Sequence, residues 1–239
     1  MIAIGNFFFR YRNILFIFLY LLLFLPSPAL FSPEVFGSQY YMLPILLGLV
    51  VTFSGEIIRG ITIGLAYIIR GGRDKKVYAE KLVTEGIFNH CRNPLYVGNI
   101  LMLLGVGILS NSLIYVGVVM PLFLFIYQTI VLAEENFLRN KFGSDFDAYC
   151  KRVNRWMINF NGLGKTMSQM KFNYNRWLLK EYNTLFVWLV GIVAILIFRY
   201  PEFTAGQEER FQIFGFILAA LFFVYLYVRY LKKSGKMRD

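Results

Sequence analysis

Residues 113–133 read LIYVGVVMPLFLFIYQTIVLA, an apolar run without a charged side chain that ends directly at Glu134 and Glu135. An α-helix needs about 20 such residues to cross the hydrocarbon core of a bilayer. Further apolar runs lie at residues 14–25, 41–69, 97–109, 184–198 and 211–230. The run at 97–109 is short and only Asn111 and Ser112 interrupt the sequence before the next run, so we expect a tight helical hairpin.

The composition agrees with a membrane protein. Of 239 residues, 57% are hydrophobic and 18% are aromatic, and the mean hydropathy is +0.54. A soluble domain of this length is not expected to be so apolar. We therefore predict an all-α fold, a polytopic membrane helix bundle of about six spans, with loops and short helices at its cytoplasmic end.

Positive charge is unevenly distributed along the chain. Six alternating spans place 22 of the 25 lysines and arginines on one side, with Arg199 and Arg210 opposite and Arg59 inside a run. Cytoplasmic loops carry an excess of basic residues, so both termini are expected in the cytoplasm of a bacterial-type inner membrane or an ER-like membrane. The net charge of +11 then reflects topology, and we expect membrane lipids rather than nucleic acid as partners.

Two other interpretations have less support. Arg10 and Arg12 precede the first apolar run, as in a secretory signal, but the residues after the run lack a small-x-small cleavage site. Cys91 and Cys150 have no second cysteine at metal-ligand spacing, so we expect no metal site.

A polar segment, residues 82–98, separates two of the apolar runs and reads LVTEGIFNHCRNPLYVG. Gly86 permits a turn, and Pro94 suits the first turn of the helix that follows. Amide groups at that helix start, together with His90 and Arg92, would form an anion pocket. The alternative is an ordinary helix start whose basic residues anchor at lipid headgroups.

A second polar segment, residues 133–156, follows the longest uncharged run. Ionised Glu134 and Glu135 would be costly there without partners, so we expect each to have one. Gly143 can end their helix and Ser144 can cap the next. The next helix carries an apolar stripe at helical spacing, formed by Phe146, Tyr149, Val153 and Trp156, which we expect on the membrane surface or against other spans.

Together these two segments resemble the isoprenylcysteine carboxyl methyltransferase and phospholipid methyltransferase family of membrane enzymes. In that family, G-x-(Y/F)-x-x-x-R-H-P-x-Y-x-G precedes a helical hairpin, and a Glu-Glu pair and F-G-x-x-(Y/F)-x-x-Y-x-x-x-V follow. The matching residues here are Gly86, Phe88, Arg92, Pro94, Tyr96, Gly98, Glu134, Glu135, Phe142, Gly143, Phe146, Tyr149 and Val153. The resemblance covers residues 77–156. Asn93 replaces the usual His, and this form is closer to the phospholipid branch.

The resemblance implies S-adenosylmethionine as cofactor, bound in a pocket of membrane helices and cytoplasmic loops without a Rossmann domain. The amino group of this cofactor requires an acidic residue and its carboxylate a basic one. Its sulfonium requires an electron-rich lining, and its adenine an apolar slot. The expected cofactor-binding residues are His90, Arg92, Asn93, Pro94, Tyr96, Gly98, Gly105, Glu134 and Glu135. Helix packing is the alternative role for Gly105.

Methyl transfer requires alignment of donor and acceptor and exclusion of water. Arg155 would orient a carboxylate acceptor, or would only reach toward lipid phosphate. An amine acceptor must lose a proton, for which Glu135 would be the base. We therefore expect Glu135 and Arg155 as catalytic residues, and Tyr149, Arg155, Glu56 and Arg59 as substrate-binding residues.

Glu56 and Arg59 are charged residues within an apolar run. They are three positions apart, so they share one face of the second span. Each charge at mid-membrane costs about 2.5 to 3.5 kcal/mol on insertion scales, so we expect a structural ion pair or a place in the wall of a substrate tunnel.

The leading hypothesis is S-adenosylmethionine-dependent methyl transfer to a lipid-like or hydrophobic acceptor, either a carboxylate of an isoprenylcysteine type or a phospholipid amine. The alternatives are an NADPH-dependent sterol or lipid reductase and a non-enzymatic transporter or scaffold. Residues 1–160 would form the methyltransferase core, and residues 161–239 an amphipathic connection and two added spans. The acceptor and the oligomeric state stay open at this point.

Overall fold

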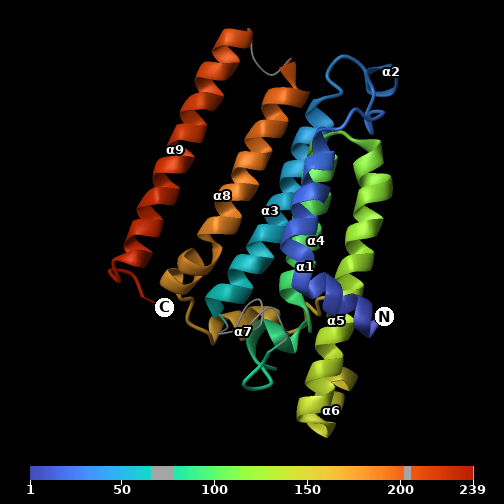
Figure 1. Cartoon of the computed structure of the whole chain (residues 1–239), viewed down its shortest axis with the longest axis vertical. Helices are drawn as coiled ribbons and strands as arrows, with labels where there is room; N and C mark the ends of the chain where they lie inside the picture. Colours follow the sequence, from blue (N-terminus) through green and yellow to red (C-terminus); the bar gives the residue numbers. More distant parts are fainter. Residues whose placement is uncertain (66–77, 202–205, 239) are drawn as a thin grey trace.

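The computed structural model describes residues 1–65, 78–201 and 206–238. Its long helices run side by side along one axis, as Figure 1 shows. They are α1 (Ile2–Leu21), α3 (Met42–Leu65), α4 (Pro94–Leu109), α5 (Met120–Phe142), α8 (Tyr174–Arg199) and α9 (Gln207–Lys233). The short helices are α2 (Pro33–Phe36), α6 (Ser144–Arg152) and α7 (Leu163–Ser168). No strand is assigned within the described ranges, so the predicted all-α bundle is confirmed.

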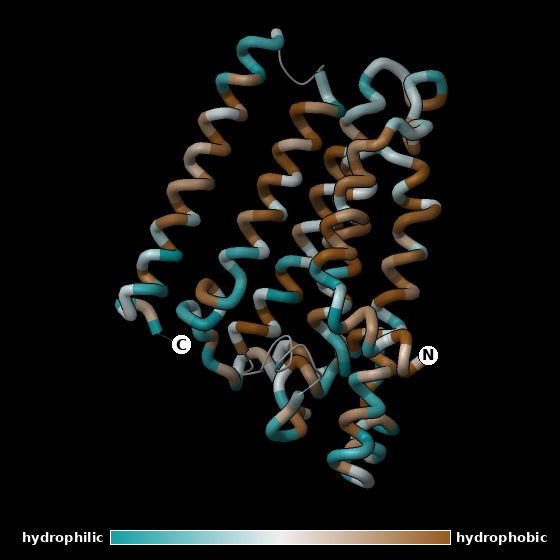
Figure 2. The backbone as a smooth tube through the Cα atoms, viewed as in Figure 1, coloured by the Kyte–Doolittle hydropathy of each residue, from teal (hydrophilic) through white to brown (hydrophobic). Residues whose placement is uncertain are grey.

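The helices have the lengths that membrane crossing requires. Among the described residues, 5 helical stretches are long and apolar enough, at Ile2–Phe24, Met42–Leu65, Tyr115–Phe142, Tyr174–Arg199 and Gln207–Lys233. The remaining predicted run, at residues 97–109, forms α4, which is apolar but only 16 residues long. Figure 2 shows hydrophobic residues through the middle of the bundle and hydrophilic residues concentrated toward its ends. The chain is an integral membrane protein.

Small residues bring α3 and α4 into close contact. A Cβ atom at Gly55 would lie 2.5 Å from the backbone oxygen of Gly98. One at Gly105 would lie 2.3 Å from the backbone nitrogen of Thr52. Such approach of two backbones is typical of helix pairs in membranes, where van der Waals packing replaces the hydrophobic effect.

The helix α8 runs antiparallel to α3 and is bonded to it where α8 begins and again near its middle. The backbone nitrogen of Asn173 donates to the carbonyl of Gly64 over 2.9 Å. Farther along α8, Trp188 Nε1 donates to Thr52 Oγ1 over 2.8 Å. In contrast, α9 is the outermost helix in Figure 1 and packs on α8.

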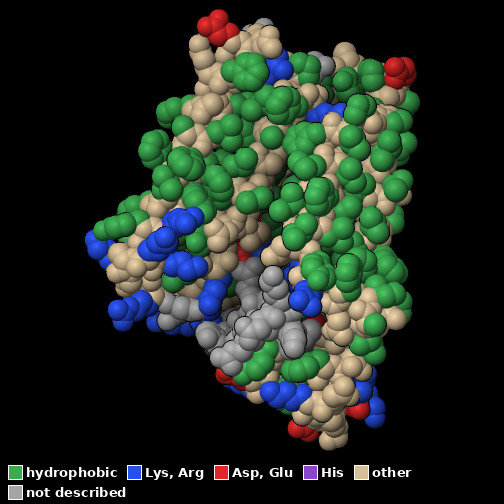
Figure 3. All heavy atoms as spheres, in the orientation of Figure 1, with side chains coloured by type: hydrophobic (Ala, Val, Ile, Leu, Met, Phe, Trp, Pro, Cys, Tyr) green, Lys and Arg blue, Asp and Glu red, His purple; other side chains and the backbone are tan. Residues whose placement is uncertain are grey.

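Charged residues gather at one end of the molecule. In Figure 3, hydrophobic side chains cover the middle of the visible face, and most of its Lys and Arg side chains lie toward the lower end. Figure 1 places both termini on that side of the bundle, together with α6 and α7. This arrangement agrees with an even number of crossings.

Candidate functional site

The polar segment before α4 is bonded to the segment after α6. The backbone nitrogen of Arg92 donates to the Asn154 carbonyl over 2.9 Å, and Asn93 Nδ2 donates to the Arg155 carbonyl over 3.2 Å. The Cys91 thiol points at the carbonyls of Arg155 and Trp156 over 3.6 Å. Burial raises the pKa of this thiol, so it stays a neutral donor. Two polar segments some 60 positions apart in sequence therefore form one structure.

A buried carboxylate lies where these segments meet α5. Glu135 is 5% exposed and is contacted by two guanidinium groups. Arg92 NH1 lies 3.0 Å from Glu135 Oε1. Arg155 donates from Nε to Oε1 over 3.0 Å and from NH2 to Oε2 over 2.7 Å. The Arg92–Glu135–Arg155 cluster thus carries one more positive than negative charge.

The neighbouring carboxylate has different partners. Glu134 accepts a hydrogen bond of 2.7 Å from the hydroxyl of Tyr96, whose ring centroid lies 5.3 Å from that of Tyr127. Arg12 of α1 also interacts electrostatically with Glu134. Consecutive helical residues point about 100° apart, because an α-helix has 3.6 residues per turn. The two acids therefore face two different surroundings.

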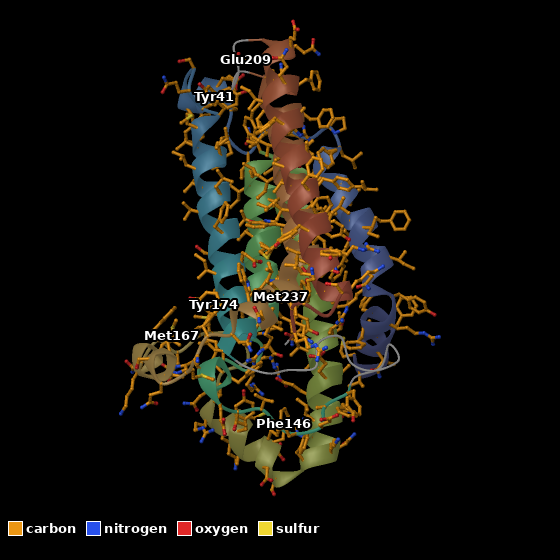
Figure 4. All side chains as sticks on the ribbon, turned by 90° about the vertical axis from the view of Figure 1, so that its left-hand side faces the viewer. Tyr41, Phe146, Met167, Tyr174, Glu209 and Met237 are labelled. Atoms are coloured by element: carbon orange, nitrogen blue, oxygen red, sulfur yellow. The ribbon has the colours of Figure 1, made fainter. Side chains whose placement is uncertain are left out.

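A cavity of about 480 Å³ adjoins the cluster. This volume lies within the range of small-molecule sites. The cavity is lined by Tyr78, Ala79, Glu80, Lys81, Leu82, Val83, Phe88, Arg92, Asn93, Glu135, Leu138, Phe146 and Tyr149. Arg92 Nε is buried and has no hydrogen-bond partner among the described residues. In Figure 4, the labelled Phe146 marks this end of the molecule, and Tyr41 and Glu209 mark the other.

Comparison with known proteins shows which family this chain resembles. A family model described as phospholipid methyltransferase matches residues 42–145. A probable protein-S-isoprenylcysteine O-methyltransferase of Oryza sativa subsp. indica is 30% identical over 133 residues, which cover 53% of this chain and 66% of the relative. The chain belongs to the family of phospholipid and isoprenylcysteine methyltransferases.

Shorter similarities connect this member of the methyltransferase family with bacterial proteins. The cobalt-zinc-cadmium resistance protein CzcN of Cupriavidus metallidurans is 38% identical over 72 residues, and the nickel-cobalt-cadmium resistance protein NccN of Alcaligenes xylosoxydans xylosoxydans is 32% identical over 73. Each match covers 30% of this chain and 33% or 34% of the relative, so the chain spans about a third of their length. No solved structure matches the chain significantly.

His90 lies beside the cavity lining rather than in it. It is 4% exposed, and its Nδ1 lies 2.7 Å from the carbonyl oxygen of Asn159. A carbonyl only accepts, so Nδ1 donates to it, and Nε2 forms a second hydrogen bond of 2.8 Å with the Thr166 hydroxyl. The structure places this predicted cofactor residue where it attaches the segment around α7 to the site.

Three other predicted cofactor residues shape α4. Pro94 begins the helix, Gly98 lies against the side chain of Arg59, and Gly105 lies against Thr52 of α3. Their observed contacts are those of helix start and helix packing.

The helix α6 brings two residues to the site, a predicted substrate-binding residue and a cysteine that was not predicted. Tyr149 lines the cavity and donates from its hydroxyl to the Phe88 carbonyl over 2.7 Å, and burial raises its pKa. Cys150 Sγ accepts from Arg92 NH1 over 2.7 Å. Sequence reasoning missed this second contact, because a lone cysteine in an amphipathic helix carries no signal of its partner.

Glu56 and Arg59 share a face of α3 as predicted, with Glu56 Oε2 3.7 Å from Arg59 Nε. The shorter contacts of Arg59 are to other helices. NH2 donates to both oxygens of Glu181 over 2.8 and 2.7 Å, and NH1 donates to Asn99 Oδ1. Sequence reasoning missed Glu181, since it precedes the apolar run at 184–198 in a stretch that reads as a basic connection.

Proposed function

We propose that this chain transfers a methyl group from S-adenosylmethionine to a lipid-like or hydrophobic acceptor at the membrane–cytoplasm interface. Its membership of the methyltransferase family supports the reaction class. The observation that carries the proposal is the Arg92–Glu135–Arg155 cluster, of which Arg92 and Glu135 line a cavity of about 480 Å³ at the basic end of the bundle.

The residues of the cavity fit the functional groups of S-adenosylmethionine. Arg92 Nε is a buried donor that a carboxylate would satisfy. Glu80 is an acid for the amino group, and Phe88 and Phe146 offer apolar surface to the adenine. When bound, the cofactor supplies a methyl group activated by its sulfonium.

The chain's own residues would orient the acceptor. Arg155 has 32% of its side chain exposed, and its hydrogen bond to Glu135 raises its pKa, so it stays charged. A planar guanidinium holds a carboxylate by parallel hydrogen bonds. The surplus positive charge of the cluster favours an anionic acceptor group over a protonated amine.

The role of Glu135 follows from its contacts. Both oxygens already accept from guanidinium groups, so in this arrangement Glu135 holds Arg92 and Arg155 rather than presenting a vacant basic oxygen. We propose carboxylate methylation as the reaction, with amine methylation and Glu135 as base as the alternative.

The test uses membranes from cells that produce the chain, incubated with S-adenosylmethionine labelled in its methyl group. We expect label in the lipid or protein fraction above that of control membranes, released by mild base as an ester would be. Label that resists base would favour an amine acceptor. Absence of incorporation, together with no heat of cofactor binding to the purified protein in detergent, would refute the proposal.

A further inference from the structure

The starting point is a buried carboxylate outside the segment matched by the family model. Glu181 belongs to α8, whereas the match ends at residue 145. Its side chain is 0% exposed, and both of its oxygens accept from NH2 of Arg59 over 2.8 and 2.7 Å. The side chain of Arg59 is itself only 4% exposed.

Arg59 connects Glu181 to α4. Its side chain lies across Gly98, where a Cβ atom would lie 2.5 Å from Arg59 Cγ. Beyond Gly98 its NH1 donates to Asn99 Oδ1. The guanidinium is therefore held from α8 on one side and bonded to α4 on the other.

Asn99 and Tyr96 share one face of α4, and Asn93 is the residue directly before this helix begins; these three residues form a polar stripe. Residues three apart lie on one helix face. Each member bonds a different part of the molecule: Asn93 the carbonyl of Arg155, Tyr96 the carboxylate of Glu134, and Asn99 the side chain of Arg59. Because Asn93 directly precedes α4 and Tyr96 and Asn99 lie on it, a rotation of α4 about its axis would shift all three contacts together.

Stability alone is a weak reason for such a pair. Buried ion pairs can often be replaced by apolar residues without loss of stability, because desolvation offsets their attraction. Ionisable residues within membrane helices are rare for the same reason and tend to mark function. The pair of Arg59 and Glu181 is better explained by the orientation that it imposes on α4.

We propose that Glu181 is a positioning residue for the methyl-transfer site. Through Arg59 and Asn99 it sets the stripe of α4 that carries Asn93 and Tyr96, and with it the alignment of the site. The inference rests on the proposed function for the reaction, and it makes the added helix α8 part of the working enzyme.

The main test is Glu181→Gln, which keeps the size of the side chain and removes its charge. We expect kcat to fall about 10- to 100-fold, as small misplacements can cause, with the cofactor Kd changed by less than about threefold. The cofactor site keeps Arg92 and Glu135 and their mutual contacts. Partial recovery of kcat in Glu181→Asp, which restores a carboxylate, is the expected rescue.

The matched control is Trp188→Phe. It removes another hydrogen bond between α8 and α3, 2.8 Å long, and keeps the aromatic packing on Phe53. We expect activity within about twofold of wild type, because the hydrogen bond that Trp188 donates goes to Thr52 and not to Arg59 or the stripe. Equal activity losses in Glu181→Gln and Trp188→Phe would overturn the inference, since any loosening of α8 would then suffice.

A second variant keeps the test valid if the Glu181→Gln protein does not fold. The double change Arg59→Gln and Glu181→Gln removes both charges of the bidentate pair, and Glu56 loses only its longer contact of 3.7 Å with Arg59. A folded but inactive double variant supports the inference, and a folded variant with wild-type kcat refutes it.

One readout does not need activity. We expect faster hydrogen–deuterium exchange over residues 94–99 in Glu181→Gln than in wild type, and no change there in Trp188→Phe. Unchanged exchange in Glu181→Gln would refute the positioning role. Failure of the wild type to bind S-adenosylmethionine or to transfer methyl groups would count against the proposed function, whatever the exchange shows.

Discussion

Two charged clusters in this molecule differ in what surrounds them. In the Arg92–Glu135–Arg155 cluster, two guanidinium groups share one carboxylate, Arg155 is 32% exposed, and a cavity adjoins it. In the pair of Arg59 and Glu181, the side chains are 4% and 0% exposed and lie between three helices. A cluster with surplus charge and an opening can bind a ligand, whereas one enclosed by helices sets their orientation.

The largest expected effect tests the enclosed pair. Glu181→Leu leaves Arg59 without its bidentate partner in a nonpolar setting, and we expect a loss of about 3 to 5 kcal/mol in unfolding free energy. The double change Arg59→Leu and Glu181→Leu should recover part of this loss, because only the longer contact of 3.7 Å between Glu56 and Arg59 is then missing. Unfolding in detergent monitored by circular dichroism measures both variants, and a double variant less stable than the single one would contradict the comparison.

The next effect tests the open cluster. Glu135→Gln removes the charge that holds Arg92 and Arg155 together, and we expect methyl transfer to fall about 100- to 1000-fold, as when an electrostatic group is removed from a reacting centre. Incorporation of labelled methyl groups measures this. Asp147→Asn is the control, because Asp147 pairs with Arg139 on the exposed surface. Activity of Glu135→Gln within a few fold of the control would argue against this site.

Arg155→Lys distinguishes charge from geometry in the open cluster. Lysine keeps the positive charge but loses the planar pair of donors, so we expect kcat/KM for the acceptor to fall about tenfold, or about 1.4 kcal/mol. Initial rates at varied acceptor concentration provide the measurement. The neighbouring exposed Arg152→Lys serves as control, and equal values for the two variants would exclude bidentate orientation by Arg155.

The smallest effect concerns the contact between His90 and α7. Thr166→Val removes the hydroxyl 2.8 Å from His90 Nε2, and we expect about 1 kcal/mol lower stability with activity close to wild type. Ser168→Ala, which removes an exposed hydroxyl of the same helix, is the matched change. A large loss of cofactor binding in Thr166→Val alone would place His90 in the cofactor site after all.

Much of the fold was predictable from local sequence. Apolar runs indicated each long helix, although the first helix begins at Ile2 rather than near residue 14. The first apolar run begins after Arg10 and Arg12, but α1 includes both of these charged residues. The resemblance placed Asn93 near the site and the chemistry of a carboxylate acceptor suggested Arg155, but the division of Glu134 and Glu135 between two surroundings could not be predicted.

The sequence by itself determined that this chain forms membrane helices with polar segments gathered at one end. Hydrophobic length and charge distribution are local properties that do not depend on how the helices pack. Only the tertiary structure decided which carboxylate meets which guanidinium, as with Glu181 and Arg59, which are 122 positions apart. Such pairs depend on helix rotation and on close contacts at small residues such as Gly98, which are set when the helices pack together.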